Sequence, residues 1–466
     1  MVTRREFLAA GAAVAATAAY EIAAQGVPSK AKPNIVFILA DDLGWGDLGC
    51  YGRPDFKTPV IDGLAARGVR LTQAYANSST CSPTRVALIT GRYQNRLPVG
   101  LYDPLPPGTP HGLPPDHPTL PSLLKSAGYV TALVGKWHLG WPPAYGPLKS
   151  GYDEFFGLYG SNMTYFTHKS GGPLAPPGAH ALHEGEQPVE REGYATDLFA
   201  ERAIEFIRRS HGKPFFLSLH FTAPHWPWEG PKDQARAHSI REMAHYEGGS
   251  LGVFREMVQS MDAAVGRVLQ ALTASGRAND TIIVFTSDNG GERYSYHWPF
   301  RGEKYYLWEG GIRVPAIVVW PGAIPAGRVV KQVAMSMDWL PTLLPLAGAR
   351  PDPAYAPDGV NLLPVLLDQG PEFERVVFWR TQDMDASRSG DWKYLRWGNY
   401  EYLYNLAEDV TENPNLKSRN PAAFERLKQA FQEWDKQMLP IPPEVKRPSS
   451  IDVRTNRARA LEHLKK

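Results

Sequence analysis

The chain has 466 residues, of which 43% are hydrophobic, so it can bury a large core and is neither disordered nor fibrous. Its 50 lysines and arginines against 48 aspartates and glutamates give a formal charge of +2, which argues against a nucleic-acid-binding protein or one held to a membrane by charge. Only Cys50 and Cys81 are present, too few for a disulfide scaffold.

The N-terminus predicts an export signal over residues 1–24. Arg4-Arg5 and Phe7-Leu8 precede an alanine-rich, weakly apolar run, an order similar to that of a twin-arginine signal peptide. The alternative is a chance arginine pair before an alanine-rich helix. No later segment reaches the roughly 20 apolar residues that span a bilayer. We therefore expect a periplasmic or secreted protein, exported by the twin-arginine machinery, without stable membrane association.

Residues 31–370 alternate short β-branched runs with stretches at helical spacing. This pattern predicts an α/β sandwich with a large, mostly parallel central sheet that is flanked by helices on both faces. The expected strands cover residues 34–40, 129–134, 215–221, 281–286 and 314–320. The expected helices cover residues 58–67, 119–127, 196–209, 253–274 and 338–346. Two segments without periodicity, 101–118 and 170–188, are expected to be surface loops.

The pattern changes near residue 373, where short aromatic-rich strands begin and one amphipathic helix follows them. The expected strands cover residues 376–380, 392–397 and 402–405, and the helix covers 421–438. This predicts a small C-terminal α+β subdomain with an antiparallel sheet over residues 371–440. Residues 441–466 form a basic tail that either wraps the protein or is disordered.

Ionic and polar residues follow the expected strands directly. In open α/β sheets, ligands bind beyond the carboxyl ends of the strands, so these side chains are expected to meet at one edge. They are Asp41 and Asp42 after the first strand, Lys136 and His138 after the second, His225 after the third, and Asp288 and Asn289 after the fourth.

The two acidic pairs predict a metal site. Asp41-Asp42 and Asp288-Asn289 together offer four oxygen donors, which suit Ca²⁺ or Mg²⁺. Taken singly, each pair could be an ordinary turn or a solvated strand end. Because both pairs follow strands of one sheet, we favour the metal site.

The segment from Cys81 to Arg85 has the features of a helix start. Ser82 is expected to be the N-cap and Pro83 the first helical residue. Cys81 would then lie at the positive helix end, which lowers the pKa of a thiol, and Arg85 would add a fixed cation. The alternative is a small cysteine that is simply buried before a helix.

The motif Cys81-x-Pro83-x-Arg85, followed by Thr90-Gly91-Arg92, resembles the signature of the formylglycine-dependent sulfatases of the alkaline phosphatase superfamily. The resemblance continues in order through Asp41-Asp42, Gly135-Lys136-Trp137-His138, Ala223-Pro224-His225, Asp288-Asn289-Gly290, Lys304 with Glu309-Gly310-Gly311-Ile312-Arg313, Gly390-Asp391-Trp392-Lys393 and Leu403-Tyr404-Asn405-Leu406. It spans nearly the whole mature chain. It implies an alkaline-phosphatase-like fold, with residues 31–370 as the sulfatase catalytic domain.

The resemblance also implies the reaction, which is the hydrolysis of an aryl or carbohydrate sulfate monoester to an alcohol and inorganic sulfate. In this family a formylglycine-generating enzyme oxidises the motif cysteine, here Cys81, to an aldehyde while the segment is unfolded. The hydrated aldehyde supplies the attacking hydroxyl. One Ca²⁺ would be held by the four oxygen donors Asp41, Asp42, Asp288 and Asn289.

The remaining roles follow from the same resemblance. Arg85 and Lys136 would hold the hydrated aldehyde, and Asp288 would deprotonate the attacking hydroxyl. His225 and Lys304 would bind sulfate and protonate the leaving alcohol. His138 would take the proton of the second hydroxyl, so that sulfate leaves and the aldehyde re-forms. The residues that flank these motifs are either substrate contacts or ordinary packing residues, and they are His168, Trp226, Trp228, Glu229, Tyr294, His297, Trp298 and Arg301.

Two alternatives stay open. Phosphonate monoester and phosphodiester hydrolases of the same superfamily carry the same Cys-x-Pro-x-Arg motif. A non-catalytic protein could instead use the pocket to bind sulfated glycans. The presence of Cys81, His138 and Lys304 together favours an enzyme, because a binding protein needs none of their chemistry.

Overall fold

The computed structural model describes residues 32–170, 181–209, 211–237, 249–443 and 445. The export signal predicted over residues 1–24 and most of the predicted basic tail lie outside them. Among the described residues, no helix is both long enough and apolar enough to cross a bilayer.

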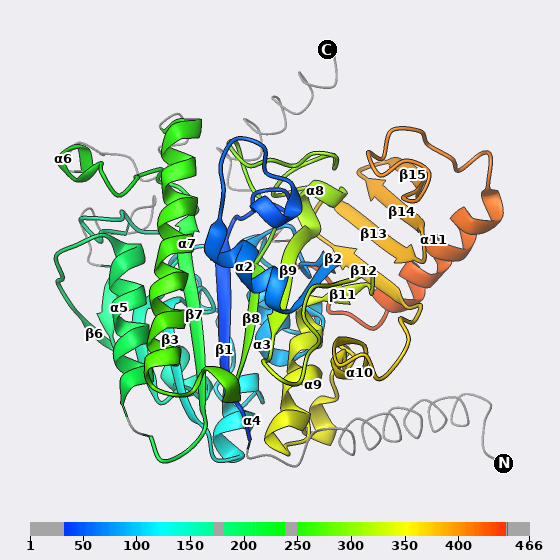
Figure 1. The fold of residues 1–466 in the computed structure, drawn as a ribbon. Coiled ribbons are helices and arrows are strands. Elements are labelled where there is room, and N and C mark those ends of the chain that lie inside the picture. The colour runs from blue at the N-terminus through cyan, green and yellow to red at the C-terminus, as the bar shows by residue number, and fades with distance from the viewer. Residues whose placement is uncertain (1–31, 171–180, 210, 238–248, 444, 446–466) are drawn as a thin grey trace.

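One large sheet forms the centre of the molecule (Figure 1). Its strands are β1 (Asn34–Asp41), β2 (Val69–Tyr75), β3 (Val130–Lys136), β4 (Glu154–Leu158), β5 (Leu182–Glu184), β6 (Gln187–Pro188), β7 (Phe215–Pro224), β8 (Thr281–Ser287), β9 (Arg313–Val319), β10 (Arg328–Val330) and β11 (Ala334–Met335). In the described part of the chain their order is β10-β2-β9-β8-β1-β7-β3-β4-β5-β6, and β11 pairs with β2.

The strands at the centre of the sheet point the same way. β3, β7, β1 and β8 lie side by side and pair in parallel. β2 has the same direction, because it is antiparallel to β9 and β9 is antiparallel to β8. The carboxyl ends of these five strands therefore lie at one edge of the sheet. The predicted α/β sandwich with a mostly parallel sheet is confirmed.

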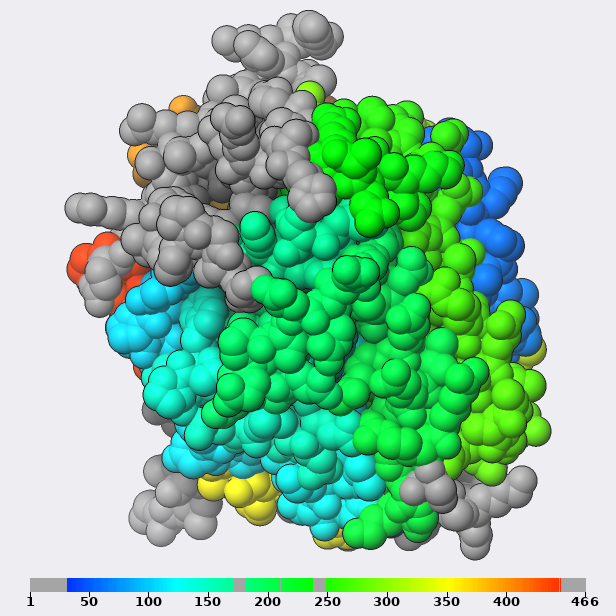
Figure 2. All heavy atoms as spheres, turned by 90° about the vertical axis from the view of Figure 1, so that its left-hand side faces the viewer, coloured from blue at the N-terminus to red at the C-terminus, as the bar shows by residue number. Residues whose placement is uncertain are grey.

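Helices cover both faces of the sheet, as the apolar sequence of β1 requires. The helices are α2 (Pro59–Arg67), α3 (Cys81–Thr90), α4 (Leu120–Ser126), α5 (Ala195–Arg208), α6 (Gln234–Ala237), α7 (Leu251–Ala274), α8 (Glu309–Ile312), α9 (Trp339–Leu343) and α10 (Leu363–Leu366). Ile35 and Phe37 pack on the side of α3, α4, α9 and α10, whereas Val36 and Ile38 pack on the side of α2, α5 and α7. Figure 2 views the molecule from the side of α5 and α7, where teal and green residues form the surface.

A second, smaller sheet follows in the chain and lies at the right of Figure 1. It is an antiparallel meander of β12 (Val376–Arg380), β13 (Met384–Ser389), β14 (Trp392–Trp397) and β15 (Tyr400–Asn405). Helix α11 (Pro421–Asp435) packs on it through residues such as Leu427 and Phe431. The predicted α+β subdomain is confirmed, and the boundary at residues 370–371 stays a prediction.

One predicted helix is broken. Residues 338–346, expected to be a single helix, fold as a 3₁₀ turn (Ser336–Asp338), the short helix α9 and a second 3₁₀ turn (Leu344–Ala347). Pro345 lacks the N–H that the next α-helical hydrogen bond would need, so the helix ends there.

Candidate active site

The predicted site residues meet at the carboxyl edge of the large sheet. Asp41 ends β1 and Lys136 ends β3, while His225 and Asp288 directly follow β7 and β8. Cys81 begins α3, which follows β2 in the chain. Lys304 reaches the same edge from the segment between β8 and β9, because β9 runs in the opposite direction and begins there.

Each of the three carboxylates at this edge has one close cationic partner, and Arg85 also lies 3.7 Å from Asp41. Lys136 Nζ lies 2.6 Å from Asp41 Oδ2. Lys304 Nζ lies 2.7 Å from Asp42 Oδ2. Arg85 Nη2 lies 2.8 Å from Asp288 Oδ2. All six side chains are buried, so these ion pairs are screened little by water.

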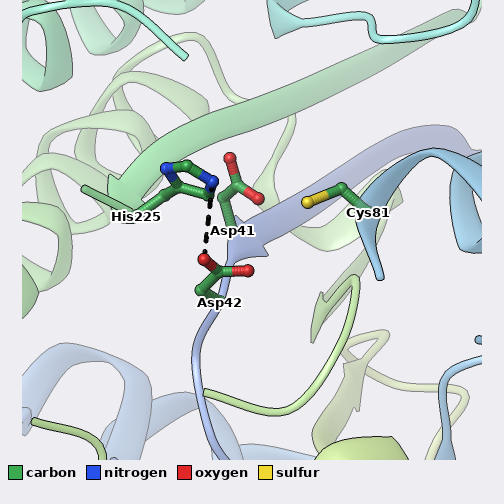
Figure 3. A group of neighbouring side chains, drawn as sticks. All are labelled: Asp41, Asp42, Cys81 and His225. Carbon is green, nitrogen blue, oxygen red and sulfur yellow. Dashed lines mark ion pairs between the residues drawn. The ribbon is translucent and has the colours of Figure 1, made fainter. Parts of the chain in front are cut away.

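The acidic pairs lie where a cation could bind. One ligand atom from each of Asp41, Asp42, Cys81 and His225 falls within 4.8 Å of the others (Figure 3). Asn289 joins this group, because its Nδ2 donates to Asp42 Oδ1 at 2.7 Å.

Two oxygen atoms at this position accept no hydrogen bond within the described part of the chain, although Arg85 Nη2 lies 3.7 Å from one of them, Asp41 Oδ1. Asp41 Oδ1 and Asn289 Oδ1 are buried without a hydrogen bond from any described residue. Unsatisfied buried acceptors are costly unless a ligand satisfies them. The oxygens of Asp41, Asp42 and Asn289 therefore fit a hard divalent cation, and Asp288, whose Oδ1 accepts from Asp42 N at 3.2 Å, lies beside them.

The pKa values of the two central carboxyl groups diverge. Burial raises the pKa of Asp41 well above its ordinary value, and the nearby charges of Asp288 and Asp42 add to the rise. Burial also opposes ionisation of Asp288, but Arg85 and Lys136 hold its pKa below the ordinary value. Asp288 is therefore ionised, whereas Asp41 needs a further positive charge to ionise fully.

The surroundings of Cys81 differ from the prediction. The N-cap of α3 is Thr80, without a side-chain cap, and Pro83 is the third helical residue. Ser82, which was expected to be the N-cap, accepts a hydrogen bond from Leu105 N at 2.7 Å instead. Burial raises the pKa of the Cys81 thiol despite the nearby Lys136, so the expectation of a lowered thiol pKa is wrong. The thiol itself is thus not an activated nucleophile.

Both predicted histidines are neutral. His138 has a left-handed backbone (φ 62°), and its Nε2 lies 3.0 Å from Leu105 O. That carbonyl requires a proton on Nε2, so the partnerless Nδ1 of the neutral ring carries a lone pair. In His225, Nδ1 contacts Trp226 O and Nε2 lies 3.6 Å from Asp42 Oδ2 (Figure 3). Burial lowers both pKa values well below the ordinary value, helped by nearby lysines.

Lys304 is held in the site by its backbone as well as by Asp42. Its N–H donates to Gly291 O at 3.0 Å, and the next residue, Tyr305, donates to Ser79 O at 2.9 Å. Burial disfavours the charged amine, yet Asp42 keeps the pKa of Lys304 well above its ordinary value. Lys304 therefore carries a proton that it could give to a leaving group.

Two buried residues that the sequence reasoning did not select also contact this site. Glu292 Oε1 lies 3.5 Å from Lys304 Nζ. His220 Nδ1 lies 3.2 Å from the carbonyl oxygen of Lys136 and 3.4 Å from Arg85 Nη1. A histidine inside the fully buried strand β7 was a signal that could have found His220.

The residues that flank the motifs have different environments. Trp228 is buried and its ring packs edge-on against Tyr294, with centroids 4.8 Å apart. Glu229 accepts a hydrogen bond from Tyr165 N. These contacts favour packing for the three residues, and their role stays a prediction. Trp298 is 68% exposed and is the flanking aromatic best placed to meet a ligand from solvent.

Comparisons with known proteins agree with this geometry. Residues 33–349 match the family described as Sulfatase. N-acetylgalactosamine-6-sulfatase of Rattus norvegicus is 36% identical over 404 residues, which are 80% of this chain and 73% of that protein. Arylsulfatase A of Bos taurus is 35% identical over 433 residues, which are 85% of this chain and 80% of that protein.

A solved structure has the same fold. The crystal structure of Ps i-CgsB superposes with a TM-score of 0.81 at 28% identity and covers 92% of this chain and 99% of its own. The same protein has also been solved in complex with k-i-k-neocarrahexaose. The family match covers most of the chain, and both relatives named above are sulfatases. The chain therefore belongs to the sulfatase family of sulfuric ester hydrolases, enzymes that hydrolyse sulfate esters.

Proposed function

We propose that this sulfatase cleaves sulfate monoesters of carbohydrates or aryl compounds with the hydrate of a formylglycine formed from Cys81, next to one bound Ca²⁺. The observation that carries the proposal is the convergence of Cys81 with Asp41, Asp42 and His225 within 4.8 Å, beside buried oxygens that accept no hydrogen bond from the described residues. The raised thiol pKa supports it too, because an unmodified Cys81 would be a poor nucleophile.

Charge balance supports the bound cation. The site contains four carboxyl groups and three basic side chains, namely Asp41, Asp42, Asp288 and Glu292 against Arg85, Lys136 and Lys304. A divalent cation would leave the site with net positive charge, which suits an anionic ester. When bound, a Ca²⁺ held by Asp41, Asp42, Asp288 and Asn289 would supply positive charge against the sulfate oxygens.

The side chains around Cys81 divide the proton transfers. Asp288 is ionised and can accept the proton of the attacking hydroxyl, while Arg85 and Lys136 hold that hydroxyl in place. Lys304 carries a proton and is our first choice to protonate the leaving alcohol. His225, which faces the same oxygen of Asp42 as Lys304 does, binds the sulfate group.

His138 completes the turnover. Its Nδ1 lone pair can accept the proton of the second hydroxyl, which allows sulfate to leave by cleavage of the C–O bond and the aldehyde to re-form. A serine at position 81 could be sulfated, but it has no second hydroxyl whose deprotonation would expel the sulfate.

Carbohydrate sulfates are the substrates that we favour. N-acetylgalactosamine-6-sulfatase is named for a sugar sulfate, and Ps i-CgsB binds k-i-k-neocarrahexaose. The exposed indole of Trp298 offers a face on which a sugar ring could stack.

One experiment tests nucleophile and substrate together. The protein is produced with a formylglycine-generating enzyme, the tryptic peptide around Cys81 is weighed, and hydrolysis of aryl sulfate, sulfated glycans, a phosphodiester and a phosphonate is compared. We expect formylglycine at position 81 and the highest kcat/KM on a sulfate ester. Full activity with an unmodified thiol would contradict the nucleophile, and faster phosphodiester or phosphonate hydrolysis would favour the alternative enzyme class.

Export is proposed on the N-terminal sequence alone. Changing Arg4-Arg5 to Lys-Lys should retain the protein in the cytoplasm, active and with formylglycine already formed, because the twin-arginine route carries folded proteins. A retained protein with a free thiol at position 81 would contradict this order of events.

A further inference from the structure

The side chain of Asp47 lies in the loop after β1 and is fully buried. Its Oδ1 accepts hydrogen bonds from Arg53 Nη1 at 2.6 Å and from Tyr296 N at 2.7 Å. Its Oδ2 accepts from Gly44 N at 2.7 Å and from Ser295 Oγ. One carboxylate thus receives four donors. Two of them come from the loop after β1 and two from the loop after β8.

These two loops carry the proposed metal ligands and touch each other near them. Gly44 follows Asp42 by two residues, and Gly291 follows Asn289 by two residues. A Cβ atom on either glycine would lie 2.1 Å from Ser295 Oγ, so only glycine allows the hydroxyl to reach between the loops. The contact is therefore close and specific.

Arg53 fixes the carboxylate from the other side. The guanidinium group of Arg53 is 3% exposed, lies over the Phe56 ring at 4.4 Å and donates to Tyr294 O at 3.3 Å. Burial raises the pKa of Asp47, and the charge of Arg53 opposes the rise. The rigid fork of Arg53 thus holds the charged form of Asp47 in one orientation.

We propose that Asp47 is a positioning residue for the calcium site, because it ties the loop that carries Asp41 and Asp42 to the loop that carries Asp288 and Asn289. Asp47 is not itself a ligand. It fixes the separation of the two ligand pairs, as groups behind metal ligands do in other metal sites. The inference rests on the proposed function, since that includes the calcium ion.

The geometry requires a carboxylate at position 47. Each oxygen accepts two donors, and one donor of each pair is a backbone N–H of a metal-bearing loop. An amide nitrogen is a donor and has no lone pair to offer. Either orientation of an asparagine would therefore face a backbone N–H of Gly44 or Tyr296 without accepting from it.

The test measures calcium affinity, not turnover. The full-length matured protein and its Asp47→Asn variant are freed of metal by prolonged chelation and titrated with Ca²⁺ by calorimetry. We expect the Kd of the variant to rise by about 10–100-fold. The increase of Tm on adding Ca²⁺ should shrink as well, because a weaker ligand stabilises less at the same concentration.

A matched control separates positioning from loss of stability. Asp262 is also a buried carboxylate that accepts two backbone N–H groups, from Val60 and Ile61, but these belong to α2 and not to a ligand-bearing loop. Asp262→Asn should lower Tm while leaving the Kd within about twofold. Equal affinity of wild type and Asp47→Asn, or equal weakening in both variants, would overturn the inference.

Two further outcomes are distinguishable. If Asp47→Asn does not fold, Ser295→Ala, which removes a single donor, decides: a raised Kd supports the inference and an unchanged Kd overturns it. If the wild-type protein itself binds no Ca²⁺, the proposed metal is wrong and the inference falls with it.

Discussion

The structure contains two buried clusters of charged side chains that differ in how well their oxygen atoms are satisfied. The active-site cluster consists of Asp41, Asp42, Arg85, Lys136, Asp288 and Lys304. The second, which we call the interface cluster, lies between the large sheet and the C-terminal subdomain and consists of Glu309, Arg313, Arg388, Lys393 and Glu412. Both are almost completely buried.

In the interface cluster Glu309 is fully paired. Its Oε1 lies 3.0 Å from Lys393 Nζ, and its Oε2 accepts from Tyr75 and lies 3.2 Å from Arg313 Nη1. Lys393 Nζ also lies 2.8 Å from Glu412 Oε1. Glu412 Oε1 and, in the active-site cluster, Asp41 Oδ1 both accept no hydrogen bond from the described residues. The cation nearest to Glu412 Oε1 lies at 2.8 Å, however, whereas Arg85 Nη2 lies 3.7 Å from Asp41 Oδ1. Buried charge alone therefore does not identify a site, whereas a weakly satisfied acceptor beside the proposed nucleophile points to one.

The largest expected effect is on the nucleophile. Cys81→Ala should lower kcat by about 10⁴-fold or more with little change in Tm, because it removes the reacting group but no ion pair. The control is Cys50→Ala, which should keep activity. Steady-state kinetics and thermal unfolding of both variants check this, and substantial activity in Cys81→Ala would place the nucleophile elsewhere.

Removing calcium should have the next largest effect. Chelation is expected to lower kcat/KM on the order of 10³-fold, since a metal contributes several kcal/mol of charge stabilisation, and added Ca²⁺ should restore it. Asp41→Ala and Asp288→Ala should lose both metal and activity. Elemental analysis that finds zinc instead would contradict the all-oxygen site.

Breaking the interface cluster should lower the stability of the protein without changing its calcium affinity. Lys393→Met leaves Glu309 and Glu412 without their shared cation, so the free energy of unfolding should fall by about 3–5 kcal/mol. The exposed Lys232, paired with Glu256, is the control, and Lys232→Met should cost less than about 1 kcal/mol. Denaturant unfolding measures both. A large change in calcium affinity for folded Lys393→Met would mean that the two clusters are not independent.

The smallest effect concerns Asp103, which joins the two regions. It contacts Ser78 and Thr80 before Cys81, and it accepts from Gln382 N of the subdomain. Burial raises the pKa of Asp103 to about 7. The folded state therefore binds the proton more tightly than the unfolded state.

The raised pKa of Asp103 in the folded state sets the expected pH dependence of stability. The contribution of Asp103 is full at acid pH, below the ordinary pKa of an aspartate, and is lost as the pH rises through about 7. Asp103→Asn should remove that loss, so between pH 5 and pH 8 its Tm should fall by a few degrees less than that of wild type. Parallel curves for the two proteins would contradict the raised pKa.

The sequence predicted the strands that consist of continuous apolar residues. The buried strands β1, β3, β7, β8 and β9 are apolar runs, and each was found to within a few residues. Because four of these strands pair side by side in parallel, the polar residues that follow them had to meet.

Strands that depend on tertiary contacts were missed. β13 reads Met-Asp-Ala-Ser-Arg-Ser, and its charges are tolerated only because Asp385 pairs with Arg396 and Arg388 reaches Tyr75. No local pattern contains those partners. The interface cluster was missed for the same reason: its Glu309 and Lys393 were noticed only within motifs of the family resemblance.

The prediction of a lowered thiol pKa was wrong because two effects compete at Cys81. A helix N-terminus and Lys136 favour the thiolate, but burial disfavours it and is the larger effect. Burial depends on the complete fold, so the sequence around Cys81 shows only the first effect.

The burial of the four proposed calcium ligands, each at most 2% exposed, has a kinetic consequence. An ion held by these ligands would remain open to the substrate, but its release would require the two ligand-bearing loops to move. Its exchange rate is then the opening rate of those loops, which is set by the stability of that region of the protein rather than by the concentration of free ion. Calcium would behave on the timescale of turnover as a permanent part of the fold.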